Sequence, residues 1–303
     1  MGTRVRVLAG LALAAARKVG EKLSAATQQQ ELASAAQAQL ERSCELQGSR
    51  VLITGSTRGI GLALAEAFLH RGAKLAVHGR DESSARTTAE KLCAAVVGSR
   101  AIGLGADLSV PGAGRRLVER ASEALGGLDV VINNAAIHDP ERKPIWATRS
   151  EEMHEVLKVN LLAPFEICAA ATALMRQCAV AGRIVNISTG AARVANVSDN
   201  GIATYAVSKF GLEALSAFLA AENPAITVTT LRPDTIDTDM VASLFPLDQR
   251  LRMLPPQSVV PAALYLASAP REDVHGKVFE QLQLVQQLAR GQSIESAPLS
   301  RFA

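Results

Sequence analysis

Short apolar runs alternate with longer amphipathic stretches along most of this 303-residue chain. Each run holds four or five mainly apolar residues, and between the runs apolar residues recur at helical spacing. The runs cover residues 51–54, 74–78, 101–105, 128–132, 183–187, 227–231 and 276–279. Strands that are apolar on both faces and separated by helices are typical of a parallel sheet with helices on each side. The pattern therefore predicts an α/β fold with a doubly wound, seven-stranded parallel sheet.

The repeating pattern stops at both ends of the chain. Residues 1–20 carry four basic residues and no acidic one, which suits either an organelle-targeting or weak secretory segment or a helical N-terminal arm. We expect residues 1–47 to be a helical N-terminal extension, 48–279 the main domain and 280–303 a tail with one amphipathic stretch and no strand. The expected location is the cytoplasm, or a plastid or mitochondrion if the extension holds a transit peptide.

Composition and charge exclude several classes of protein. Hydrophobic residues make up 48% of the chain, enough for a substantial core. A net charge of +3 and only ten aromatic residues give no support to nucleic-acid binding. The longest apolar run, 7–16, is about half of the ~20 residues that cross a bilayer, so no membrane span is expected. The four cysteines show no CxxC pair and accompany no histidine cluster, so neither a metal site nor a disulfide framework is predicted, and a reducing compartment suits them.

A glycine-rich turn follows the first predicted strand and opens a helix at residues 54–61. Gly55, Gly59 and Gly61 allow a sharp bend and let backbone N–H groups approach a pyrophosphate, which the helix N-terminus favours electrostatically. No Gly-Lys-Ser/Thr follows at the spacing of a nucleoside-triphosphate loop. The turn therefore predicts a dinucleotide site.

Two arginines near this turn bear on the choice of dinucleotide. No acidic residue precedes Arg80 at the end of the second strand, where a carboxylate would grip the ribose diol of NAD. Arg80, with Arg58 in the turn, would instead attract a 2′-phosphate. NADP(H) is thus favoured over NAD(H), unless both arginines are ordinary surface charges.

Tyr205 and Lys209 lie four residues apart and therefore share one face of a predicted helix. A phenol titrates near pH ~10, and a neighbouring ammonium stabilises the phenolate. We therefore expect Lys209 to lower the pKa of Tyr205. Hydride transfer to or from a carbinol carbon needs such a proton partner, because the oxygen gains or loses a proton at the same time.

Five segments together resemble the short-chain dehydrogenase/reductase family: 54–61, 133–136, Asn160, 187–189 and 205–209. They occur in the family's order and spacing within residues 48–279. The resemblance implies a Rossmann fold and an NADP(H)-dependent oxidoreductase that transfers hydride between nicotinamide and a carbonyl or secondary alcohol. It also implies a homodimer or homotetramer, formed through the helix that carries Tyr205 and the helix that begins near Glu152.

The resemblance also assigns roles to particular residues. Tyr205 would be the proton donor or acceptor, with Lys209 tuning it. Thr189 or Ser188 would orient the substrate oxygen; Thr189 aligns with the family's serine if the following loop is lengthened, whereas an ungapped count puts Ala192 there. Asn160 would serve a proton relay, or be a buried amide that braces the backbone. The cofactor-binding positions would be Gly55, Thr57, Arg58, Gly59, Ile60, Gly61, Arg80, Asp107, Leu108, Asn133, Ala135, Tyr205, Lys209, Pro233, Ile236 and Thr238.

The chain departs from the family pattern at several positions. Ala136 and Asp234 stand where glycine is usual, and we expect Ala136 to be tolerated if its φ is negative. These departures, with the altered serine position, leave open an alternative: a dinucleotide-binding sensor or interaction protein with little or no catalysis. Residues 238–256 are rich in apolar side chains and would form either a mobile lid suited to an apolar substrate or an amphipathic helix packed on the core.

Overall fold

The computed structural model describes residues 27–29, 31–36, 38, 46–139, 141–192, 201–242, 244–251 and 253–298. Residues 1–26 and Cys44 lie outside these ranges, so the targeting hypothesis for residues 1–20 does too. Within the extension, residues 27–29, 31–36 and 38 are helical, and the buried Ala36 joins the main hydrophobic core.

Seven parallel strands form the sheet, in the order β3-β2-β1-β4-β5-β6-β7. Each boundary lies within two residues of the prediction, so the predicted doubly wound sheet is confirmed. The strands are β1 (Arg50–Ile53), β2 (Lys74–Gly79), β3 (Arg100–Gly105), β4 (Val130–Asn133), β5 (Arg183–Ile187), β6 (Thr227–Arg232) and β7 (Lys277–Glu280).

An eighth strand extends the sheet beyond β7. β8 (Ala297–Pro298) pairs antiparallel with β7, with Val278 opposite Ala297 and Lys277 opposite Pro298. The expectation that the tail contains no strand was therefore wrong. Two residues, one of them proline, are too few for an alternating pattern to show.

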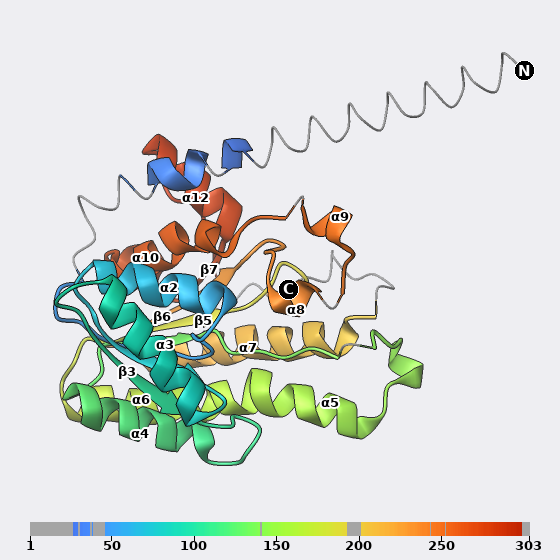
Figure 1. Ribbon diagram of the computed structural model, residues 1–303, viewed down its shortest axis with the longest axis horizontal. Helices are drawn as coiled ribbons and strands as arrows, with labels where there is room; N and C mark the ends of the chain where they lie inside the picture. Colours follow the sequence, from blue (N-terminus) through green and yellow to red (C-terminus); the bar gives the residue numbers. More distant parts are fainter. Residues whose placement is uncertain are drawn as a thin grey trace, which may run out of the picture.

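Helices cover both faces of the sheet and bury its side chains in two clusters (Figure 1). Strand β1 shows the alternation: Val51 and Ile53 face one cluster and Leu52 the other. On the first face lie α2 (Gly59–His70), α3 (Glu82–Ala95), α10 (Val260–Ser268) and α12 (Gln281–Arg290). On the second lie α4 (Ala113–Leu125), α6 (Ala163–Gln177) and α7 (Ala203–Glu222). Because Leu284, Val285 and Leu288 of α12 are buried in the first cluster, this part of the tail packs as part of the core.

One long helix combines three elements, α5 (Ser150–Leu157), the π-helical turn η2 (Lys158–Leu162) and α6. Over its 28 residues it is long and apolar enough to cross a membrane, but half of its most apolar window is buried inside the fold. There it packs against α4 and α7, which is how a core helix of a globular domain behaves.

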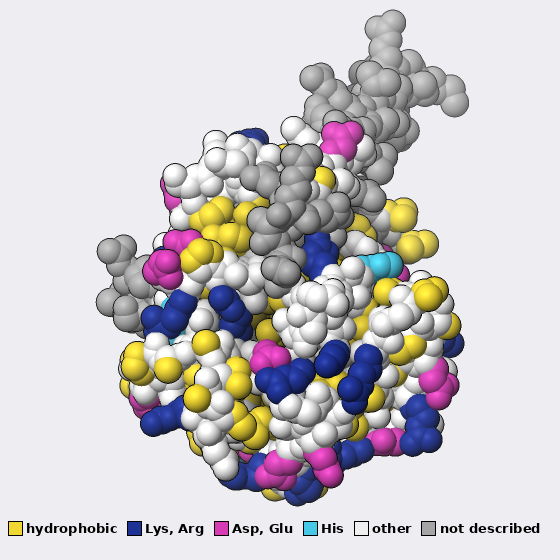
Figure 2. Space-filling view, turned by 90° about the vertical axis from the view of Figure 1, so that its left-hand side faces the viewer, with side chains coloured by type: hydrophobic (Ala, Val, Ile, Leu, Met, Phe, Trp, Pro, Cys, Tyr) yellow, Lys and Arg dark blue, Asp and Glu magenta, His cyan; other side chains and the backbone are white. Residues whose placement is uncertain are grey.

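Short elements complete the described chain: η1 (Ile145–Ala147), α8 (Asp239–Ala242), α9 (Leu247–Arg250), η4 (Pro256–Val259) and α11 (Arg271–Val274). On the face drawn in Figure 2, acidic and basic side chains are interspersed among apolar ones.

Candidate active site

The segments that follow β1, β2, β4, β5 and β6 line one cleft of about 1180 Å³ at the carboxyl edge of the sheet. In open parallel sheets, ligands bind in the crevice outside the carboxyl ends of the strands. The cleft contains most of the predicted site residues, among them Thr57, Arg58, Arg80, Asp107, Leu108, Ala135, Thr189, Tyr205, Lys209, Pro233, Ile236 and Thr238. Within the described ranges, no three His, Cys, Asp or Glu side chains come together as metal ligands.

The glycine turn between β1 and α2 is packed too tightly for a Cβ at Gly55 or Gly61. Gly55 has φ +63°, and a Cβ there would lie 2.9 Å from the Cα of Ala135. A Cβ on Gly61 would overlap the carbonyl oxygen of Gly55. Gly59, at the start of α2, also has a positive φ of 56°. The turn therefore presents bare backbone to the cleft, as a phosphate site requires.

Asn134 fixes this turn, a role that sequence reasoning missed. Its Nδ2 donates to the carbonyl oxygens of Thr54 (2.9 Å) and Gly55 (3.1 Å). In return, the hydroxyl of Thr54 accepts the N–H groups of Asn134 (2.9 Å) and Ala135 (3.0 Å). The β4–α5 loop thus holds the glycine turn at four points.

The structure places the side chain of Asn133 outside the cleft, and the cofactor-binding role predicted for this position stays a prediction. Its Nδ2 donates to Asn186 Oδ1 (2.8 Å) and to Cys168 Sγ (3.3 Å) in the buried second face of the sheet. Asn133 is the last residue of β4, and successive strand residues point to opposite sides. Ala136 has a negative φ, since Arg142 and Ala179 are the non-glycine residues with positive φ in the described chain, so its methyl group causes no backbone strain.

His78 connects the glycine turn to the end of β3 and was also missed. Its Nδ1 accepts the N–H of Gly55 (3.0 Å), and its Nε2 lies 3.0 Å from the carbonyl oxygen of Ala106. An Nδ1 that accepts must be unprotonated, so the hydrogen lies on Nε2. Burial lowers the pKa of His78, which keeps the ring neutral.

Charged side chains line the cleft beside the glycine turn. Arg80 faces Asp107, whose pKa is lowered by hydrogen bonds from Ser109 and by the charge of Arg80. The carboxylate of Asp81 caps α3 by accepting the N–H of Ser84 (2.7 Å). Arg58 makes an exposed ion pair of 3.6 Å with Asp239 at the start of α8.

Tyr205 and Lys209 enter the cleft from α7, as their spacing predicted. The side chain of Thr189 acts to lower the pKa of Tyr205, yet burial raises it to about 12. The Nζ of Lys209 lies 5.8 Å from the centre of the Tyr205 ring and donates to the carbonyl oxygen of Ile187 (2.8 Å). Burial lowers the pKa of Lys209 to about 8. Burial of the phenol therefore dominates its pKa in this structure, and the expected effect of Lys209 on it stays a prediction.

Thr189, rather than Ser188, reaches Tyr205. The hydroxyl of Ser188 points into the core and donates to Glu213 Oε1 (2.6 Å). Ala192, the position given by an ungapped count, is fully buried. The lengthened loop after residue 189, which the family comparison required, is thus consistent with the geometry.

Asn160 is fully buried and joins the β4–α5 loop to α7. Its Oδ1 accepts the N–H of Ile137 (2.8 Å), and its Nδ2 donates to the carbonyl oxygen of Ile137 (2.8 Å) and to Ser208 Oγ (3.0 Å). Its side chain therefore braces the backbone, and it lies in the π-helical turn η2.

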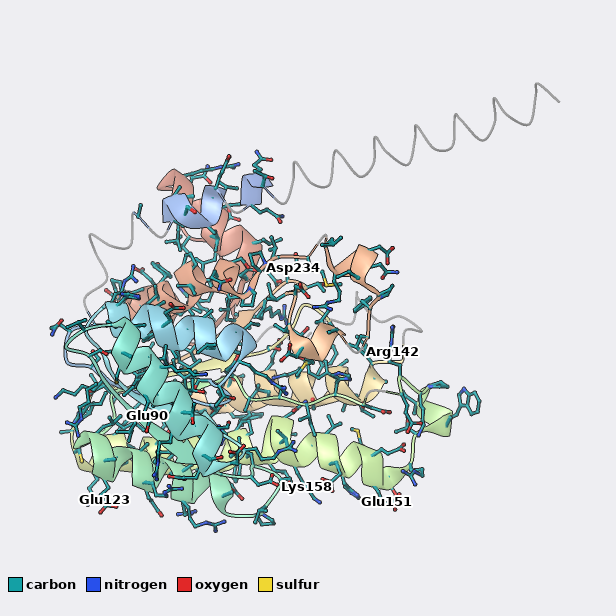
Figure 3. All side chains as sticks on the ribbon, in the orientation of Figure 1. Glu90, Glu123, Arg142, Glu151, Lys158 and Asp234 are labelled. Carbon is teal, nitrogen blue, oxygen red and sulfur yellow. The ribbon has the colours of Figure 1, made fainter. Side chains whose placement is uncertain are left out.

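The segment 238–256 forms two short helices, α8 and α9, rather than one amphipathic helix. Four of its apolar side chains line the cleft: Met240, Val241, Leu244 and Phe245. Arg142, from the β4–α5 loop, donates to the carbonyl oxygen of Leu244 (3.1 Å) and lies 5.4 Å from the ring centre of Phe245. Figure 3 shows Arg142 and Asp234 near α8. The N–H of Asp234 donates to Gln281 Oε1 (3.3 Å), and its own carboxylate accepts the N–H of Thr235 (2.6 Å).

Comparison with known proteins gives the same picture. Residues 49–248 match the family model described as short chain dehydrogenase. Among curated relatives, a 1-deoxy-11-beta-hydroxypentalenate dehydrogenase of Streptomyces arenae is 34% identical over 199 residues, covering 64% of this chain and 69% of that protein. The 3-oxoacyl-[acyl-carrier-protein] reductase FabG of Escherichia coli K12 is 30% identical over 211 residues, covering 69% and 81%.

Solved structures resemble this chain over most of its length. A short chain dehydrogenase from Burkholderia cenocepacia J2315 in complex with NADP is 29% identical, with a TM-score of 0.69, and the match covers 78% of this chain and 97% of that one. A 3-oxoacyl (acyl-carrier-protein) reductase from Agrobacterium tumefaciens C58 with NADP bound is 28% identical, with a TM-score of 0.70, covering 80% and 95%.

Proposed function

Because this chain belongs to the short-chain dehydrogenase/reductase family, and is thus an NAD(P)-dependent oxidoreductase acting on CH–OH groups, we propose that it uses NADP(H) to interconvert a carbonyl and an alcohol with Tyr205 as proton donor and acceptor. The observation that supports this most strongly is the contact between Tyr205 and Thr189 inside the cleft. A phenol and a second hydroxyl side by side can both bind one substrate oxygen.

The residues of the cleft fit a dinucleotide phosphate. The glycine turn has no room for a Cβ at Gly55 or Gly61, so its N–H groups and the N-terminus of α2 can bind the pyrophosphate. Arg80 and Arg58 supply two guanidinium groups for a 2′-phosphate. The carboxylate of Asp81, the residue after Arg80, is engaged by the N–H of Ser84 and the hydroxyl of Ser83. When bound, the nicotinamide group supplies or accepts the hydride.

The protein's own groups handle the proton. With a pKa near 12, Tyr205 is a neutral phenol at physiological pH and can donate its proton to the oxygen of a carbonyl being reduced. Thr189 positions that oxygen and stabilises its developing negative charge. Lys209 carries its proton below pH about 8 and then stabilises the phenolate that the donation leaves.

The lid segment favours a substrate with an apolar body. Met240, Val241, Leu244 and Phe245 line the cleft from α8 and the residues after it. Apolar walls with few polar groups are typical of sites that recognise hydrophobic small molecules. The position of Thr189 beside Tyr205 in the cleft supports catalysis over the alternative of a sensor with little catalysis.

The test is turnover by the purified chain. NADPH oxidation would be followed by absorbance with acetoacetyl-coenzyme A, acetophenone, cyclohexanone and benzaldehyde as probes. We expect at least one probe to be reduced, and Tyr205→Phe to bind NADPH normally but lose turnover. The chain offers a matched control, Tyr265→Phe, because these are its two tyrosines and Tyr265 lies on α10 outside the cleft. Equal turnover by Tyr205→Phe and the control would contradict the proposal.

A further inference from the structure

Three consecutive residues at the end of β5 are held by one face of α7. The side chain of Thr189 contacts Tyr205, the carbonyl oxygen of Ile187 accepts from Lys209 (2.8 Å), and the hydroxyl of Ser188 donates to Glu213 (2.6 Å). The three α7 residues, Tyr205, Lys209 and Glu213, are spaced by four and therefore follow one another along the helix. The first two belong to the proposed catalytic group, and the third, Glu213, has no role in it so far.

Glu213 is a charged group buried where no water reaches it. Its exposed fraction is 0%, and a carboxylate in such a place must be paired. Arg232, at the end of β6, pairs with both of its oxygens, through Nε to Oε1 (2.7 Å) and Nη2 to Oε2 (2.5 Å). The remaining Nη1 of Arg232 donates to Glu280 (3.0 Å) at the end of β7. The carboxylate is thus held rigidly between α7 and two strands.

The Glu213 carboxylate holds the chain where it leaves β5, at Ser188 and Thr189. The hydroxyl of Ser188 donates to the buried carboxylate of Glu213, and the next side chain, Thr189, lines the cleft. A Ser188 without this partner could rotate freely and would no longer fix the strand end. The hydrogen bond thus fixes the residue that directly precedes Thr189.

The Glu213 carboxylate also favours the charged form of Lys209. The charged and titratable groups around Lys209 are Tyr205 and Glu213 on its own helix, with Arg232 of β6 on the far side of Glu213. Burial disfavours the ammonium of Lys209, and the negative charge of Glu213 opposes that effect.

We propose that Glu213 is a positioning residue of this oxidoreductase, which orients Thr189 through Ser188 and keeps Lys209 protonated. Ser188 is then an anchor for the strand end and not a catalytic hydroxyl. This inference rests on the proposed function, since it concerns how Tyr205, Lys209 and Thr189 are held.

The decisive measurement is the pH dependence of carbonyl reduction by the full chain with NADPH, using the best of the four probes. Glu213→Gln keeps the size of the side chain and an oxygen for Ser188 but removes the charge. As the pH rises, we expect the turnover of Glu213→Gln to decline earlier than that of the wild type. The midpoint of this decline should lie lower by roughly half a pH unit or more. A merely structural defect would lower turnover at every pH and leave the midpoint in place.

A double variant separates the lost charge from the unpaired arginine. In Glu213→Gln with Arg232→Gln, both members of the ion pair are neutral and no buried guanidinium is left without its main partner. We expect the midpoint to stay low in the double variant, because Lys209 still lacks its negative neighbour. Recovery of the wild-type midpoint would assign the shift to Arg232 and overturn the proposal. Because the double variant needs no buried ion pair, it also serves if Glu213→Gln does not fold.

Ser188→Ala tests the orientation of Thr189 without touching any charge. We expect turnover to fall roughly tenfold with the pH midpoint unchanged, and NADPH affinity and the melting temperature to stay near those of the wild type. Suppose that Tyr205→Phe is inactive. The proposal is then contradicted if Ser188→Ala turns over as fast as the wild type, or if Glu213→Gln keeps the wild-type pH midpoint. If Tyr205→Phe itself is fully active, the proposed function fails instead, so the two failures are distinguishable.

Discussion

The side chain of Thr189 lies beside Tyr205, sixteen positions further along the chain, in one cleft. The contact joins the end of β5 to the first turn of α7 inside the cleft. It places two hydroxyl groups where a single substrate oxygen can meet both.

Removal of the Thr189 hydroxyl should slow the reaction without affecting the cofactor. We expect Thr189→Ala to lower kcat roughly 100- to 1000-fold, the usual effect of losing one donor to a developing oxyanion. NADPH affinity, measured by fluorescence titration, should be unchanged. Thr189→Ser keeps the hydroxyl and should retain most of the turnover. Comparable rates for the alanine and serine variants would show that Thr189 is not the orienting group.

The pH dependence of reduction should follow Lys209. Its pKa is lowered to about 8, whereas Tyr205 stays protonated until about 12, so the ammonium is the first of the two groups to lose its proton as pH rises. Turnover should therefore be full below pH about 8 and decline above it. In Lys209→Arg the cation persists, and the decline should move to higher pH. An unchanged decline in this variant would point to a different titrating group.

The proposed preference for NADP(H) should depend on Arg80. We expect Arg80→Gln to weaken NADPH binding by roughly tenfold and NADH binding hardly at all, because the guanidinium would pair with the 2′-phosphate. Isothermal titration with both cofactors measures the difference. Arg86→Gln, on α3 outside the cleft, is the matched control. Equal losses for the two cofactors would remove Arg80 from the phosphate site.

Exposed apolar side chains on α6 and α7 predict an oligomer. Phe165 is 56% exposed and Phe218 69% exposed, on the two neighbouring helices that the family resemblance assigns to the subunit interface. We propose a homodimer or homotetramer and expect Phe218→Glu to reduce its mass in light scattering. Val97→Glu is the control, since Val97 is 95% exposed at the far end of α3. A wild-type chain that is monomeric at micromolar concentration would contradict the prediction.

The sequence allowed the sheet and the main chemical groups to be predicted, because both depend on local patterns. Apolar runs located all seven parallel strands, and a spacing of four put Tyr205 and Lys209 on one helix face. The sequence could not show which of two adjacent residues points into the cleft, as Asn133 and Ser188 illustrate. That choice depends on partners distant in the chain, Asn186 and Glu213, whose contacts arise only after folding.

The sequence also indicated that Glu213 and Arg232 are buried charges, and the predictions did not use this signal. Glu213 is a carboxylate four residues after Lys209 on a helix with otherwise apolar neighbours, and Arg232 ends a buried strand. A charge in either place needs a partner, so the two could have been paired by reasoning. The rise in the pKa of Tyr205 that burial causes could not be predicted from the sequence, because it depends on how completely the surrounding elements close over the phenol.

The short strand β8 also affects what can attach to this sheet. The outer edge of a β-sheet exposes unpaired N–H and C=O groups on which the strand of another chain can assemble. Here the outermost described strand holds Pro298, which has no N–H to donate, and it covers the edge of β7 at Lys277 and Val278. The pair thus protects the sheet at that edge against the strand addition that leads to aggregation.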